Sequence, residues 1–365
     1  WWTLGWWIAA QSLFAQSPKR PFTPFEIDAS AHVGFIIDHQ ENVGHLVGSH
    51  PISFNASIYR LTTGDKGWES ASFFPKIGVS LHYSDLRSDI LGQVVAILPN
   101  MKFSWWRMKH GGQLEFKIGT GLAYLSNPWS LDRNFSNTMY SFPLLTAMNF
   151  GLIYSQPLTP RWKLRLSAEI YHFSNGAFSL PNAGINTPSV AIGAIYSPNA
   201  HKIEWRDSIR PFRQTLYLQA AMRGGVIERN PAQGSKNVVV NADIGIAWRW
   251  RRKNILLAGF EYSLNTAIRD LIAEEIPTGS RPDYARLGLV VGHELVAGSV
   301  SLLTQLGVYI YRPYDKIDLP LYQRIGLRYY FNDRLFGQFG MKLHLGAAEC
   351  LEFGVGYNIW KISKD

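Results

Sequence analysis

Apolar and polar residues alternate one by one along most of this chain, in short runs that turn residues separate. The run "KIGVSLHYS" (76–84) places Ile77, Val79, Leu81 and Tyr83 on one face. Side chains at positions i and i+2 of a strand share a face, so this period predicts β-strands with one apolar face each. We identify roughly 14 to 16 such runs from residue 28 onward, which is within the range of closed outer-membrane barrels.

Composition indicates where the apolar faces point. Charged residues are 17% of the chain and aromatic residues 14%, whereas soluble proteins carry about 25% charged residues. Beyond the N-terminal segment, the sequence has no uninterrupted apolar run of the ~18 residues that a spanning helix needs. We therefore predict an all-β fold, a transmembrane antiparallel β-barrel of roughly 14–16 strands, integral to a bacterial outer membrane. A soluble β-sandwich, which shows the same alternation, is the alternative fold.

The connections between the predicted strands fall into two length classes that tend to alternate. Short turns occur at 109–112, 159–161, 251–254 and 332–333, and long segments at 126–137, 175–186, 265–283 and 312–319. Short turns are typical of the periplasmic end of a barrel and long loops of the outer end. The segments 61–72 and 199–213 are long but fall on the short-turn side.

The division into domains follows from these connections. Residues 1–20 resemble the remnant of a signal peptide, being apolar, then small, then polar. We interpret residues 21–200 as a barrel half and residues 201–365 as a C-terminal β extension that completes the same barrel. The alternative is an eight-stranded barrel followed by a second β domain.

Charge and histidine spacing give no sign of other partners. The net charge is +9, but the basic residues are scattered along the chain, which argues against a nucleic-acid partner. Asp38, His39, His45 and His50 lie close together in the sequence, but their spacing matches no metal-site template. We expect no metal and no other cofactor.

A polar pair closes the apolar row of one strand. In "RWKLRLSAEIYHFS" (161–174) the apolar residues occupy even positions, and His172 and Ser174 end that row. Asn186 begins the apolar row of the next strand, so it too should face outward. Polar side chains at lipid depth are costly, and an imidazole that takes a serine proton makes the serine a nucleophile. The Asn175 side chain and the turn N–H groups at Gly176 could hold an oxyanion.

The plainer interpretation is a polar pair wetted by lipid headgroups at a strand end, because His-x-Ser is a weak motif. The segment "HFSNGAFSLPNAGIN" (172–186), however, resembles the signature of the lipid A 3-O-deacylases (PagL-type). It also closely resembles their longer Bacteroidetes-type members, often labelled acyloxyacyl hydrolases, which "FFPKIGVSLHYSD" (73–85) and "KIGTGLAYLSNPW" (117–129) resemble too. The resemblance covers roughly residues 28–200, and the C-terminal part is similar to the extension of the longer members.

This resemblance implies a serine esterase in the outer membrane that removes an ester-linked acyl chain from lipid A or a related glycolipid. By position, His172 is the base, Ser174 the nucleophile and Asn175 the oxyanion residue. The acidic member of the family's triad falls on Asn186, where this chain has asparagine. Asparagine can orient an imidazole but cannot stabilise its charge.

The resemblance also implies lipid A, or lipopolysaccharide, of the outer leaflet as the partner. The alternative function is a non-enzymatic barrel, either a channel or a structural subunit of a larger envelope complex.

Overall fold

The computed structural model describes most of the chain, namely residues 24–40, 43–199, 205–207, 209, 211–230, 234–317 and 319–363. The predicted signal-peptide remnant lies outside the described residues. None of the helices found within these ranges has the length and apolar character to cross a membrane.

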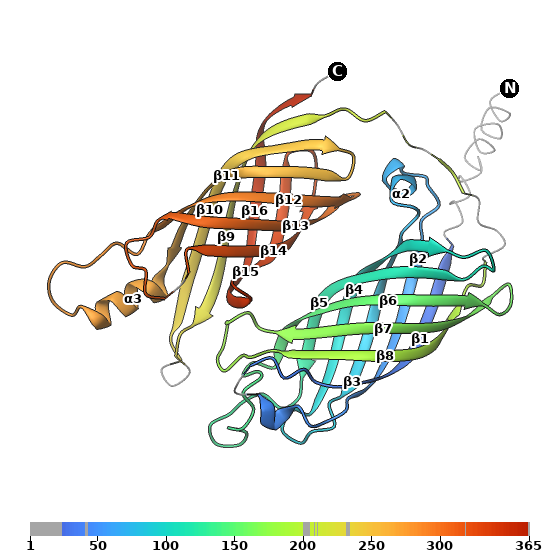
Figure 1. Ribbon diagram of the computed structural model, residues 1–365, viewed down its shortest axis with the longest axis horizontal. Coiled ribbons are helices and arrows are strands. Elements are labelled where there is room, and N and C mark those ends of the chain that lie inside the picture. Colours follow the sequence, from blue (N-terminus) through green and yellow to red (C-terminus); the bar gives the residue numbers. More distant parts are fainter. Residues whose placement is uncertain are drawn as a thin grey trace, which may run out of the picture.

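The alternating runs form sixteen antiparallel strands (Figure 1). The first eight are β1 (Phe25–Gly34), β2 (Ile52–Leu61), β3 (Lys76–Asp85), β4 (Gln93–Arg107), β5 (Gln113–Leu125), β6 (Leu144–Pro157), β7 (Trp162–Ser174) and β8 (Ile185–Tyr196). The next eight are β9 (Thr215–Glu228), β10 (Lys236–Arg251), β11 (Asn254–Asn265), β12 (Arg286–Ala297), β13 (Val300–Tyr311), β14 (Leu321–Tyr330), β15 (Leu335–His344) and β16 (Ala347–Ser363). Among the described residues, three short helices occur in connections: η1 (Gly44–Leu46), α2 (Gly67–Ala71) and α3 (Thr266–Glu275).

The predicted all-β antiparallel barrel class is confirmed, in the alternative arrangement of two barrels. β8 pairs back with β1, and β16 pairs with β9, so each set of eight strands closes on itself. Residues 201–365 therefore do not complete the first barrel, because its strands have no free edge left to pair. The long segment 199–213 is the linker between two barrels that lie side by side (Figure 1) and not a turn within one barrel.

Both barrels point apolar side chains outward and charged side chains inward. In the first barrel, Arg165 Nε lies 3.0 Å from Asp28 Oδ1, and Lys102 also contacts that carboxylate. In the second, Glu261 contacts Arg223 at 2.6 Å, Arg324 at 2.6 Å and Lys342 at 3.2 Å. These buried charges are paired across the lumen, which packs each barrel interior with side chains instead of leaving it open.

The first barrel also has an apolar plug at one end, where the connections 35–51 and 126–143 lie. Buried residues from the strand ends and from the loops at this end form it: Ile36, Val43, Leu46, Leu86, Leu91, Val94, Ala96, Leu98, Ala123, Leu125, Met139, Tyr140, Leu145, Ala147, Tyr171, Phe173 and Ile185. Phe173 lies in the chain between His172 and Ser174, and Ile185 precedes Asn186. The plug therefore supports from inside the strand ends that carry the polar pair.

Candidate active site

β7 places His172 and Ser174 on the face that its apolar residues share. Leu166 on this face is 41% exposed, whereas Arg165 and Glu169 on the other face are buried in the lumen. His172 is half-buried, and Ser174 is only 5% exposed because the following loop covers it. Both side chains thus belong to the outer wall of the first barrel by parity.

The pairing of β7 with β8 brings Asn186 directly opposite His172. His172 Nδ1 lies 2.7 Å from Asn186 Oδ1. Since the amide oxygen can only accept, Nδ1 carries the proton and Nε2 keeps the lone pair. This is the tautomer that a general base needs, and Asn186 selects it by orienting the ring.

The hydroxyl of Ser174 is bonded to its own loop. Ser174 Oγ accepts hydrogen bonds from Asn182 Nδ2 at 2.9 Å and from Gly176 N at 3.1 Å. Within the described ranges it makes no hydrogen bond to His172. Gly184 packs against His172 and Ser174. A Cβ on Gly184 would lie 3.3 Å from His172 Cε1 and 3.6 Å from Ser174 Cβ, and the φ angle of Gly184 is +78°. Glycine at 184 lets the loop approach the pair closely.

Asn175 has a different position from the one expected of an oxyanion donor. Its Nδ2 donates to Ser179 O at 2.9 Å, and its backbone N donates to Asn182 Oδ1 at 3.2 Å. Asn175 therefore braces the loop, and the amide that reaches the serine is that of Asn182. The sequence alone did not point to Asn182, because no spacing rule places a loop residue next to a serine eight positions earlier in the chain. The only signal was the number of asparagines in "SNGAFSLPNAGIN".

An apolar groove of about 490 Å³ crosses the lipid-facing wall from β1 over β8, β7 and β6 to β5, and on β7 its lining reaches Ile170, two residues from His172. Ala168 and Ile170 line it in the same row as His172, and Pro188 and Val190 line it in the same row as Asn186. At a rise of about 3.3 Å per residue, the row from His172 to Ala168 is about 13 Å long. The groove opens on the lipid-facing wall, and its lining is mostly apolar.

The histidines that the sequence places near an outer loop have structural contacts. His39 Nε2 lies 3.0 Å from Ala183 O, and His45 Nε2 lies 2.8 Å from Ser136 O. They tie together loops at the end of the first barrel that carries the site. In the part of the chain that the structure describes, no three His, Cys, Asp or Glu side chains come together in a way that could hold a metal ion.

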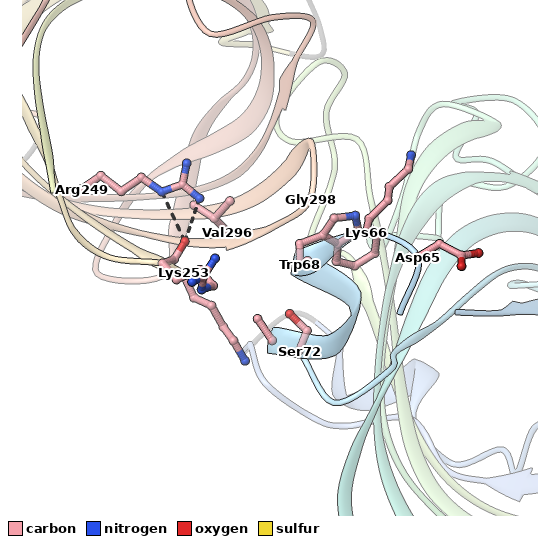
Figure 2. Close-up of a pocket in the computed structure, with 11 residues that line it drawn as sticks. Asp65, Lys66, Trp68, Ser72, Arg249, Lys253, Val296 and Gly298 are labelled. Atoms are coloured by element: carbon pink, nitrogen blue, oxygen red, sulfur yellow. Dashed lines mark hydrogen bonds between the residues drawn. The ribbon is translucent and has the colours of Figure 1, made fainter. Parts of the chain in front are cut away.

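A second pocket, of about 440 Å³, lies between α2 and the second barrel (Figure 2). Trp68 packs against Gly298, where an added Cβ would lie 2.9 Å from the indole. Figure 2 shows the ammonium groups of Lys66 and Lys253 pointing to opposite sides. The basic side chains of this pocket do not converge on one point, so we interpret it as a junction between the barrels.

The fold, two closed antiparallel barrels with apolar outer faces, is that of an integral β-barrel protein of the bacterial outer membrane. Comparison with known families agrees. The family model "Lipid A 3-O-deacylase (PagL)" matches residues 53–194, and "Acyloxyacyl hydrolase, C-terminal domain" matches residues 215–361. The chain belongs to the lipid A 3-O-deacylase family, in its longer form with an acyloxyacyl hydrolase C-terminal domain, and is an ester hydrolase.

Solved structures of outer-membrane barrels are similar to single barrels of this chain. The crystal structure of the outer membrane enzyme PagL is 18% identical, with a TM-score of 0.34, and the match covers 46% of this chain and 97% of that one. Neisserial surface protein A is 9% identical, with a TM-score of 0.34, and covers 47% of this chain and 96% of its own. No curated protein sequence matches the chain.

Proposed function

We propose that this protein hydrolyses an ester-linked acyl chain of lipid A in the outer leaflet, with Ser174 as nucleophile and His172 as general base. One observation carries the proposal. A histidine oriented by Asn186 shares the lipid-facing row with a serine two residues away, directly above an apolar groove. An acyl chain in that groove would bring its ester carbonyl to the serine.

The proposed reaction has two steps. His172 Nε2 takes the Ser174 proton while Oγ attacks the acyl carbonyl, and the imidazolium then protonates the leaving sugar oxygen. Water next attacks the acyl-enzyme with the same base, which releases a fatty acid and restores the serine. For the first step Ser174 turns about χ1 from its loop donors toward Nε2. That rotation frees Asn182 Nδ2 and Gly176 N for the developing oxyanion.

The placement in the outer leaflet rests on the connections. β7 ends at the same end of the first barrel as the long connections 35–51 and 126–143, whereas 108–112 and 158–161 are short turns at the other end. Long loops are typical of the outer end of such barrels. Lipid A of the outer leaflet would then lie beside His172 and Ser174.

The packed lumens disfavour the channel alternative. Lys102 and Arg165 share Asp28 inside the first barrel, and Glu261 joins three cations inside the second. Porins of the channel type keep a water-filled interior. The remaining alternative is a structural subunit of an envelope complex.

Mass spectrometry of lipid A tests the proposal in a deletion strain that carries either the wild-type gene or Ser174→Ala. We expect one acyl mass to be lost with the wild type and to be kept with the variant. Ser167→Ala is the matched control, because Ser167 lies on the same strand but bonds to Glu169 in the lumen. Heat-modifiable migration checks that each variant folds. Lipid A that the wild type leaves unchanged would refute the proposal and favour the structural subunit.

A further inference from the structure

The loop that follows Ser174, residues 175–184, is bonded to the second barrel. Glu228, the last residue of β9, is buried at 8% exposure and points at this loop. Its Oε2 accepts hydrogen bonds from Leu180 N at 2.6 Å and from Ser179 Oγ at 3.0 Å. A carboxylate from the second domain thus fixes two consecutive residues of the loop.

Two further contacts extend this attachment along the loop. Glu228 N donates to Ala177 O at 2.8 Å. Lys236 Nζ donates to Phe178 O at 2.6 Å and lies 4.6 Å from the centre of the Phe178 ring. Every residue from Ala177 to Leu180 is therefore held by the rim of the second barrel.

The backbone at the start of this loop needs such support. Gly176 has φ +58° and Ala177 has φ +67°, in the left-handed region that alanine rarely adopts. Strained residues persist where the surroundings over-determine them. Ala177 packs against a cluster of the second barrel made of Ile227, Val239, Ala267 and Cys350.

Gly176 faces the same barrel. A Cβ on Gly176 would lie 2.2 Å from Leu351 Cγ. The second barrel thus sets the conformation of the two residues immediately after Asn175.

The same loop supplies the donors at the nucleophile, Gly176 N and Asn182 Nδ2. We propose that the second barrel is a positioning device for the esterase site, and that Glu228 is its principal positioning residue. This inference rests on the proposed function. Donors aimed at an oxyanion stabilise the transition state more than the bound substrate, so loosening them lowers kcat and leaves KM nearly unchanged.

The experiment uses the full-length chain in detergent micelles with purified lipid A. We expect Glu228→Ala to lower kcat about 10- to 100-fold, with KM within about twofold of the wild type. Glu228→Gln keeps an oxygen that can accept from Leu180 N–H, so its kcat should fall by less than about fivefold. Glu274→Gln is the matched control, because that carboxylate bonds Arg229 at the outer end of the second barrel, and its kcat should equal the wild-type value.

Hydrogen exchange measures the loop without relying on activity. Amides of residues 176–180 should exchange faster in Glu228→Ala than in the wild type and be unchanged in Glu274→Gln. If Glu228→Ala fails to migrate as a folded barrel, Lys236→Met replaces it, because it removes the bond to Phe178 O.

Wild-type kcat together with wild-type exchange in Glu228→Ala would overturn the proposal. A rise in kcat would also overturn it, because the contact would then restrain the enzyme. If the wild type shows no Ser174-dependent hydrolysis, the proposed function fails, and the positioning role in catalysis fails with it. The exchange measurement still reports whether Glu228 holds the loop.

Discussion

Each barrel has a histidine bonded to an asparagine on its lipid-facing wall. His172 Nδ1 lies 2.7 Å from Asn186 Oδ1 in the first barrel, and His293 Nε2 lies 2.8 Å from Asn254 Oδ1 in the second. His293 shares its row with Leu295, which is 46% exposed. An imidazole and an amide can satisfy each other at lipid depth, so such a pair does not by itself indicate catalysis.

Two differences separate the pairs. His172 lies two residues before the end of β7, at the barrel end with the long connections, and Ser174 is two residues on. His293 lies four residues before the end of β12, near the short turn to β13. Thr304 stands opposite His293, but its hydroxyl donates to the His293 carbonyl at 3.3 Å. A serine two residues away on the same face, at the end of the barrel that carries the long connections, distinguishes the candidate site from its counterpart.

Replacing each histidine gives the largest expected effect. His172→Ala should lower lipid A deacylation by about 10,000-fold or more, because the nucleophile loses its base. His293→Ala should leave the rate unchanged. Fatty-acid release from lipid A measures both. Equal losses in the two variants would show that the wall histidines are structural.

The second barrel contributes lumen charges that should matter for stability and not for chemistry. Glu261→Gln breaks contacts to Arg223, Arg324 and Lys342. Removing one partner of a buried cluster leaves uncompensated charge and should cost about 3–5 kcal/mol of unfolding free energy. Denaturant unfolding followed by heat-modifiable migration measures this. Glu275→Gln, at the exposed last residue of α3, is the control and should unfold like the wild type.

Replacing Asn182, the hydrogen-bond donor at Ser174 that only the structure revealed, should have the next largest effect. Asn182→Ala removes the amide that lies 2.9 Å from Ser174 Oγ. Loss of one oxyanion donor lowers kcat by about 100-fold. Asn175→Ala should lower kcat less, because its amide bonds Ser179 O within the loop. A larger loss of kcat in Asn175→Ala than in Asn182→Ala would indicate that Asn175, and not Asn182, is the oxyanion donor.

Replacing Asn186 or Asn254, the partners of the two wall histidines, should give the smallest effect on kcat. Asn186→Ala removes one hydrogen bond that orients the base, worth about 1–1.5 kcal/mol, and should lower kcat about tenfold. Asn254→Ala removes the matching bond in the second barrel and should leave kcat unchanged. Steady-state kinetics on lipid A compare them. An unchanged rate in Asn186→Ala would show that His172 keeps its orientation without that partner.

The residues of β7 show how far a sequence can be interpreted alone. The faces of the strand follow from its period of two, so the shared row of His172 and Ser174 needed no coordinates. The outward face of Asn186 followed from the order of its own row, but its place directly opposite His172 required the register of β7 with β8. Asn182 and Glu228 could not be found in this way, because a loop conformation and a contact between barrels bring them to the site.

The sequence by itself determined the all-β class, the outward and inward faces, and the position of the polar pair, since alternation is a local property. Only the tertiary structure decided that the strands close as two barrels. Every strand here carries the same alternation, and nothing in that pattern says whether β8 pairs with β1 or with β9. That choice depends on hydrogen bonds between residues more than 150 positions apart, such as Ile27 with Tyr196.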